Sequence, residues 1–192
     1  MRLSILVILS LLFCSTVGFA ETVSVKNPGA VKSGKPRDAK LIDSEKKLAL
    51  DCLKAIDDMA KADGVAKAIA EINKGRVGAF GSLMPKEHFY LSLCEFKTDT
   101  SAVFVAHGTN PAFVGFEVPS LDIFKDNTGW NYAEAMFKKA GGKDNFDGTI
   151  EGILWSDPEW QKGKKDQMVA YNKVAKYGQK KYWTYYAVWI EE

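Results

Sequence analysis

One of the two histidines in the chain stands where an imidazole could do chemistry. His107 ends an alternating run that starts at Ser101, and the sequence GTNP that follows at 108–111 is typical of an irregular loop. An imidazole there could donate a hydrogen bond to a carboxylate, more strongly when protonated, since its ordinary pKa is about 6.5. The alternative is a structural histidine that fixes the turn at Asn110 by bonding backbone carbonyls.

Aromatic residues that carry a polar atom crowd the last third of the chain. Trp155, Tyr171 and Tyr185 each combine an apolar ring with an N–H or O–H donor, which suits the wall of a pocket for a small polar ligand. The alternative is plain core packing, with each donor satisfied inside the protein. We therefore keep these three residues as candidate pocket walls.

The composition excludes several other functions. Of 192 residues, 46% are hydrophobic and 26% charged, as expected for one folded domain. A net charge of +2 is too balanced for an electrostatic nucleic-acid binder. Two histidines without a Cys-x-x-Cys pair make a zinc site hard to assemble, and no glycine-rich nucleotide motif or Gly-x-Ser-x-Gly elbow is present. We expect no enzyme and no cofactor; a hydrolase would need a serine or cysteine within hydrogen-bond reach of His88 or His107.

Residues 1–20 are typical of an export signal. Arg2 precedes an apolar run from Leu3 to Phe13, and the small residues Gly18 and Ala20 stand where a signal peptidase requires them. The apolar run is about half the length that a membrane-spanning helix needs. We expect cleavage near Ala20 and a periplasmic or secreted protein. An uncleaved anchor and a lipoprotein built on Cys14 are the alternatives.

Export changes how the two remaining cysteines, Cys52 and Cys94, are interpreted. Cysteines in an oxidising compartment can pair, and a bridge here would close a loop of about 42 residues and add roughly 3–4 kcal/mol of stability. The alternative is two buried free thiols, because cysteine is among the most buried residue types. The sequence leaves both possibilities open.

Hydrophobic periodicity predicts an α+β domain. Residues 21–38 show no periodicity and are expected to be a flexible leader. A long helix starts at Ala39, with Asp43 or Ser44 as the cap of a later start, and Gly64 separates it from a second helix. Further predicted elements are strands at 88–96 and 101–107, a helix at 131–140, and strands at 146–155, 165–176 and 181–190. Hairpin-length connections make this sheet antiparallel.

Several segments, taken in their order, resemble a single Cache domain, a PAS-like extracytoplasmic sensory domain. They are AIAEINKG at 68–75, VAHGTNPAFVG at 105–115, LWSDP at 154–158, VAYNKV at 169–174 and the closing strand that ends at 187–189. The loop at 107–115 is the most specific of them. The resemblance covers residues 39–192 and implies a long N-terminal helix packed on a five-stranded antiparallel sheet.

The resemblance also implies a function. Such domains hold a small molecule, commonly a small organic acid, under the loop after the second strand, and they report to a membrane-bound receptor or kinase. The ligand-binding residues that it implies here are His107, Tyr90, Trp155, Met168, Tyr171 and Tyr185. We therefore expect a stand-alone exported protein that binds a small carboxylate for sensing or delivery.

Two departures from the family pattern bear on the ligand. The family often has a lysine where this chain has Met168, and small residues where it has Tyr185 and Tyr186. Without that lysine a carboxylate would need protonated His107, so affinity would fall between about pH 6 and pH 8. If the tyrosines fill the pocket, the alternative is an interaction or structural protein of the cell envelope.

Overall fold

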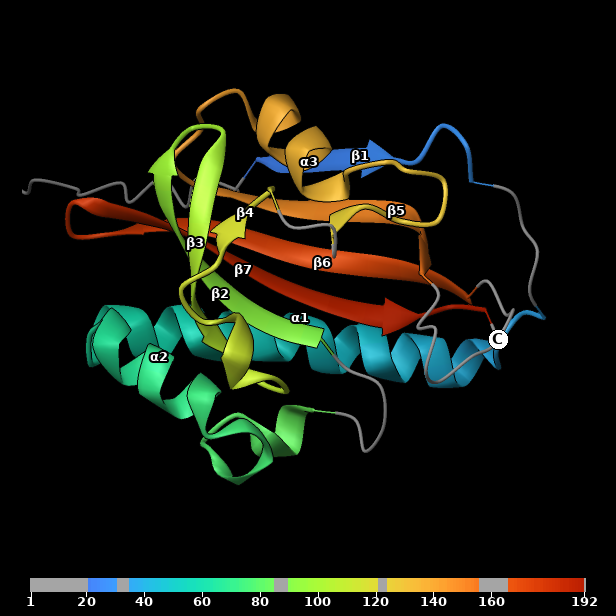
Figure 1. Ribbon diagram of the computed structural model, residues 1–192. Helices are drawn as coiled ribbons and strands as arrows, with labels where there is room; N and C mark the ends of the chain where they lie inside the picture. The colour runs from blue at the N-terminus through green and yellow to red at the C-terminus, as the bar shows by residue number, and fades with distance from the viewer. Residues whose placement is uncertain (1–20, 31–34, 85–89, 121–123, 156–165, 192) are drawn as a thin grey trace, which may run out of the picture.

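The computed structural model describes residues 21–30, 35–84, 90–120, 124–155 and 166–191. They form a seven-stranded mixed sheet, ordered β1-β5-β6-β7-β2-β3-β4, with helices on both faces (Figure 1). The strands are β1 (Thr22–Lys26), β2 (Tyr90–Thr98), β3 (Ser101–His107), β4 (Glu117–Val118), β5 (Phe146–Trp155), β6 (Asp166–Tyr177) and β7 (Lys180–Trp189). The helices are α1 (Ala39–Ala62), α2 (Val65–Asn73) and α3 (Tyr132–Ala140), with short 3₁₀ turns η1 (Gly75–Val77), η2 (Gly81–Leu83) and η3 (Pro111–Phe113).

The α+β class is confirmed, and the five predicted strands form the antiparallel centre of the sheet, β5-β6-β7-β2-β3. The predicted architecture is wrong in detail, because the sheet has seven strands and three helices pack on it. The two unforeseen strands lie at the edges, where β1 and β4 are only five and two residues long. Runs this short carry too little alternation to be recognised in a sequence.

The largest difference from the sequence prediction lies in the expected leader at 21–38. Its first part is β1, which pairs in parallel with β5 and buries Val23 against the face that carries α3. The Thr149 hydroxyl donates to the Ser24 hydroxyl across the pair, at 3.0 Å. A partner more than 120 residues away leaves no local signal, so reasoning from neighbouring residues could not find this strand.

Helix ends follow from capping side chains. The carboxylate of Asp38 accepts a hydrogen bond from the backbone N–H of Leu41 at 3.0 Å, so α1 begins at Ala39 as predicted, and the alternative of a later start capped by Asp43 or Ser44 does not hold. Asn131 caps α3 in the same way, and Gly141 ends that helix in the left-handed conformation.

The sheet separates two apolar clusters. One lies under α1 and α2, and the other lies under α3 and the segment between β3 and α3. Cys52 belongs to the first cluster and Cys94 to the second, and both are buried free thiols. Of the two possibilities that the sequence left open, the structure has the free thiols, because the two side chains lie on opposite faces of the sheet.

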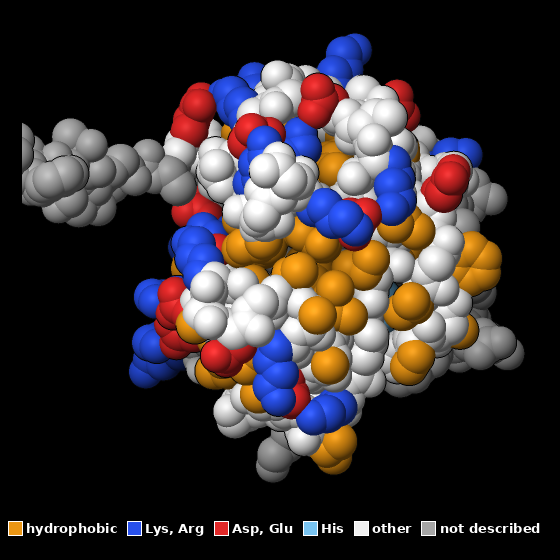
Figure 2. Space-filling model, turned by 90° about the vertical axis from the view of Figure 1, so that its left-hand side faces the viewer, with side chains coloured by type: hydrophobic (Ala, Val, Ile, Leu, Met, Phe, Trp, Pro, Cys, Tyr) orange, Lys and Arg blue, Asp and Glu red, His pale blue; other side chains and the backbone are white. Residues whose placement is uncertain are grey.

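The surface at one end of the molecule is partly apolar. Figure 2 views the molecule from its left-hand side in Figure 1, where hydrophobic side chains gather in the middle of the face and charged residues surround them. Val65 and Ile69 of α2 and Val105 of β3 are only half-buried, so α2 covers its part of the sheet incompletely. Among the described residues, no helix is long and apolar enough to cross a membrane. The predicted export signal at 1–20 lies outside the described residues.

Candidate functional site

A cavity of about 230 Å³ lies on the α3 face of the sheet, under the loop that follows β3. Six aromatic side chains form most of its wall: Tyr90, Phe104, Phe113, Phe124, Tyr132 and Tyr185. Met168 adds an apolar surface, and the polar groups come from Ser92, His107, Thr109 and Asn110. The loop after the second central strand thus covers a cavity, as the resemblance implied.

A β-bulge directs His107 into this cavity. The register between β2 and β3 shifts after Leu93, which pairs with Ala106, because the next residue pairs with Phe104 and leaves Val105 without a partner. Val105 and Ala106 both contact the α1-side cluster, whereas Phe104 and His107 both line the cavity on the opposite face. Without the extra residue, strand alternation would place His107 on the α1 side.

The imidazole of His107 fixes the loop that covers the cavity. Its Nδ1 atom accepts hydrogen bonds from the backbone N–H groups of Thr109 and Asn110, at 3.3 and 3.0 Å. Because Nδ1 accepts, we assign the proton of the neutral ring to Nε2. Nε2 has no hydrogen-bond partner among the described residues, so its N–H is available to a molecule in the cavity.

Burial keeps this histidine neutral. Only 5% of His107 is exposed, and burial lowers its pKa to about 4. The ligand-free ring is therefore neutral at neutral pH, because a charged ring would lose its hydration, and this disfavours the protonated His107 that the sequence analysis expected beside a bound acid. The two roles weighed from the sequence also turn out to be compatible, because Nδ1 fixes the turn and Nε2 faces no protein partner. The turn-fixing bonds come from backbone N–H groups rather than carbonyls.

Tyr132 and Tyr185 form a second polar feature of the cavity. Their rings stack with centroids 6.1 Å apart, and their hydroxyl groups hydrogen-bond to each other. Burial is the main cause that raises the pKa of both phenols, so both remain protonated donors at neutral pH. Within the described part of the chain, no lysine, arginine, aspartate or glutamate lines the cavity.

The structure brings together four of the six residues that the sequence suggested for the ligand site. His107, Tyr90, Met168 and Tyr185 all line the cavity, and the side chain of Trp155 lies outside the described part. Tyr171 lies on the other face, in the cluster under α1. The reason is register: Tyr171 pairs with Tyr186, so Tyr171 and Tyr185 point to opposite sides.

Sequence reasoning missed the other seven lining residues. Phe104, Phe113, Phe124 and Tyr132 come from β3 and the segment that follows it, while Ser92, Thr109 and Asn110 supply polar atoms. The loop motif already contained Thr109 and Asn110, and the predicted helix at 131–140 contained Tyr132. Nothing local marked Phe124, whose ring stacks on Phe104 with centroids 5.6 Å apart.

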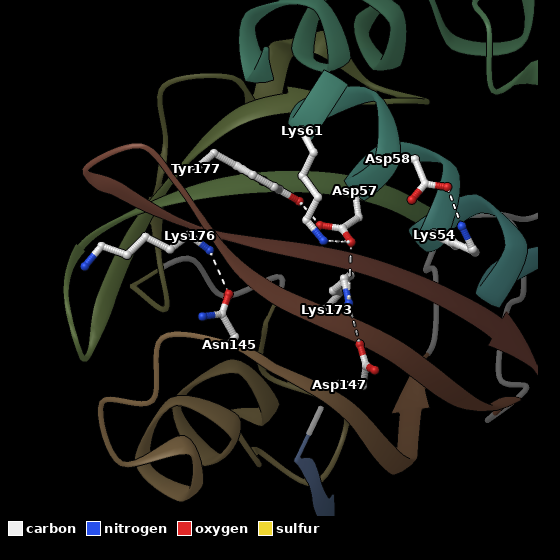
Figure 3. A network of polar contacts seen from close by, with 9 residues as sticks. All are labelled: Lys54, Asp57, Asp58, Lys61, Asn145, Asp147, Lys173, Lys176 and Tyr177. Carbon is white, nitrogen blue, oxygen red and sulfur yellow. Dashed lines mark hydrogen bonds and ion pairs between the residues drawn. The ribbon is translucent and has the colours of Figure 1, made fainter. Parts of the chain in front are cut away.

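Tyr171 lines a separate groove on the α1 face, between α1 and strands β5 and β6. Several residues that line the groove belong to a polar network between α1 and the sheet (Figure 3). Asp57 of α1, 6% exposed, accepts from the hydroxyl of Tyr177 at 2.9 Å and pairs with Lys61 at 2.6 Å. Lys173 lies between Asp57 and Asp147, at 3.8 and 3.0 Å. Tyr171 and Lys173 thus belong to a structural junction between α1 and the sheet.

The described residues contain no group of three His, Cys, Asp or Glu side chains that could hold a metal ion. Near His107, the hydroxyl of Thr109 lies 3.2 Å from Nδ1, but that atom already accepts two backbone hydrogen bonds. A general base needs a free lone pair directed at the nucleophile. The geometry favours binding by His107 over proton abstraction.

No known family model matches this chain, and no curated protein does. Two solved structures are similar to it, each at 16% sequence identity and a TM-score of 0.44. One is described as the structural basis for carboxylic acid recognition by a Cache chemosensory domain; the match covers 79% of this chain and 92% of that chain. The other is the periplasmic sensor domain of a chemotaxis protein, and that match covers 80% of this chain and 100% of that chain.

Proposed function

We propose that this protein binds one small organic acid in the His107 cavity, without catalysis, and reports or delivers it outside the cytoplasm. The observation that carries the proposal is a cavity whose wall contains the Nε2–H of a neutral histidine, which has no hydrogen-bond partner among the described residues. An N–H donor in a cavity wall can bind an acceptor atom of a small ligand, such as a carboxylate oxygen.

The cavity size limits the ligand. A volume of about 230 Å³ equals the space of roughly eight water molecules, at about 30 Å³ each. That is below the range of pockets for drug-sized ligands. A compact acid with a short apolar tail, such as propionate, fits this space, with the tail against Met168 and the phenylalanine rings.

The charge of the acid would be met by neutral donors. His107 supplies Nε2–H, and Ser92 and the tyrosine hydroxyls of the wall supply O–H groups. A buried anion held in this way is tolerated only when several donors converge on it. We therefore expect one carboxylate to be accepted and two to be rejected, since no cation among the described residues lines the cavity.

A second ligand class is favoured by the same wall. Six aromatic rings without a lysine or arginine beside them suit a small amine cation, which is attracted to aromatic faces. Neutral His107 would not repel it. This candidate leaves Nε2–H without an acceptor, which is why we place the acid first.

Location and partner belong to the proposal too. The pattern at 1–20 supports export with cleavage near Ala20, into the periplasm or the medium. A membrane-bound receptor or kinase would then read the ligand state. The alternative, an envelope protein with a filled pocket, is disfavoured by the cavity itself: Tyr185 lines it without filling it, and Tyr186 packs under α1.

A series of compounds that are similar in size but differ in charge tests the ligand class. Thermal unfolding of the protein without residues 1–20 is followed with propionate, propionamide, propylammonium and succinate. Propionate should stabilise the protein most, by about 2.7 kcal/mol at 100 times its dissociation constant, and succinate should not. A larger stabilisation by propylammonium than by propionate would mean that the ligand is a small amine and not an acid. No shift with any compound would contradict a ligand site.

A further inference from the structure

Strand β3 has a partner on its outer edge only up to the bulge, while β2 pairs with it on the inner edge as far as His107. On its outer edge, β4 pairs with Ala102 and Val103, and Gly115 and Phe116 bond to Phe104. Beyond the bulge no strand of the described residues continues this edge, although the carbonyl of Val105 and the N–H of His107 still face outward. Unpaired backbone groups at a partly buried edge are unfavourable, so something must replace the missing strand.

The side-chain amide of Asn73 takes that place. Its Nδ2 donates to the carbonyl of Val105 at 3.3 Å, and its Oδ1 accepts from the N–H of His107 at 3.0 Å. An amide offers a donor and an acceptor in the spacing of a peptide group, so one side chain replaces one residue of a strand. These two bonds hold the residues on either side of Ala106 in the bulged conformation.

Asn73 belongs to the opposite face of the sheet. It is the last residue of α2, which packs with α1 in the cluster on the far side from the cavity. Two residues later, Gly75 has a φ of 59°, and a Cβ placed on it would lie 2.7 Å from the carbonyl oxygen of Gly108. The end of α2 therefore contacts both His107 and the residue after it.

We propose that Asn73 is a positioning residue of the His107 cavity, through which α2 on the opposite face sets the orientation of the His107 ring. This deepens the proposed function, since it concerns the same cavity. Its test uses no ligand, so it remains decisive even if no organic acid binds.

The surroundings of His107 make its titration a clean reporter of this role. The ionisable groups that line the cavity with it are the phenols Tyr90, Tyr132 and Tyr185, and no charged side chain among the described residues does so. From the α2 side, the neutral amide of Asn73 accepts a hydrogen bond from the backbone N–H of His107. Burial alone lowers its pKa to about 4, so any loosening of the loop should raise that pKa.

The experiment is a nuclear magnetic resonance titration of the His107 ring nitrogens in the ligand-free protein, with Asn73→Ala compared with the wild type. Asn145→Ala is the matched control, because Asn145 also accepts from a backbone N–H, that of Lys176, at 3.1 Å on an exposed site (Figure 3). Asn73→Ala should raise the His107 pKa by about one unit or more, towards its ordinary value. Asn145→Ala should leave it unchanged.

A second readout follows the link to α2. In the wild type, the chemical shifts of backbone amides at the end of α2, such as those of Ile72 and Lys74, should change with pH at the same midpoint as the His107 ring. In Asn73→Ala these amides should show no such change. If Asn73→Ala does not fold, Asn73→Ser, which is too short to make both bonds, is measured in its place. An unchanged His107 midpoint in a variant that only loses stability would overturn the proposal and leave Asn73 a structural residue.

Discussion

The Nδ1 atom of His107 accepts a hydrogen bond from the backbone N–H of Asn110 at 3.0 Å, and this bond defines the site. It closes the loop over the cavity and fixes the ring proton on Nε2, where no described residue accepts it. One ring thus fixes the loop through Nδ1 and, in the proposed function, binds the ligand through Nε2–H, so the two roles that the sequence left open do not exclude each other.

The first prediction concerns stability against pH. The His107 pKa is about 4 in the folded protein and about 6.5 in an unfolded chain, so between these values the unfolded state binds more protons. Stability should therefore fall as pH decreases from about 6.5 to 4, by up to about 3 kcal/mol from this residue. Urea unfolding at several pH values measures it.

His107→Gln is the control for this prediction. Glutamine does not titrate, so the free energy of unfolding of the variant should not fall in this way between pH 6.5 and 5. Carboxylates change the stability little in that range, so the difference reports on His107. Equal slopes in the two proteins would mean that His107 is not held neutral by burial.

The second prediction concerns Met168, which lines the cavity where the family often has lysine. Met168→Lys places a cation beside the bound acid and should lower the dissociation constant for propionate by tenfold or more, or about 1.4 kcal/mol. The ligand-free variant should be less stable, because the new ammonium group is buried. Calorimetry measures the affinity, and Met168→Leu, similar in volume, should change little. Weaker binding of propionate to Met168→Lys would show that its carboxylate does not lie beside position 168.

The third prediction compares two neighbouring aspartates of α1. Asp57→Ala removes the acceptor of the Tyr177 hydroxyl and a partner of Lys61 and should cost about 1–3 kcal/mol in urea unfolding. Asp58 forms an exposed pair with Lys54 (Figure 3), so Asp58→Ala should destabilise the protein much less than Asp57→Ala. Equal losses would show that the network around Asp57 does not join α1 to the sheet.

The fourth prediction concerns the cysteines. Cys52 and Cys94 are buried free thiols, and burial raises the pKa of Cys52 to about 12. Thiolate is the reactive form, so neither should react with an alkylating reagent in the native protein without residues 1–20. Both should react in denaturant, with or without reductant. A requirement for reductant would reveal a disulfide.

Local patterns in the sequence predicted the elements well but not their pairing. Alternation predicted the bounds of β3 and β5 to the residue, and the helix predicted at 131–140 differs from α3 by one residue at its start. The parallel strand β1 was missed because its partner is distant in the chain.

The same holds for the candidate site, where residue types were predicted and strand register was not. His107 was found from its residue type and the loop after it, but the bulge that directs it into the cavity depends on the register with β2. Tyr171 was misplaced because a single-residue difference in register decides which face a side chain occupies. Register is a property of two strands together, and a residue pattern within one strand does not contain it.

The fifth prediction is the most direct test of the central claim, that the ligand binds on the α3 face beside His107. Tyr185→Phe and Tyr171→Phe remove the same hydroxyl group from adjacent strands, but from opposite faces of the sheet. Titration calorimetry with propionate, or with the best compound of the charge series, is made on both variants and the wild type. Tyr185→Phe should weaken binding about three- to tenfold, as expected for one lost hydrogen bond, and Tyr171→Phe should match the wild type. Weaker binding to Tyr171→Phe with unchanged binding to Tyr185→Phe would contradict the account and move the ligand to the groove beside α1.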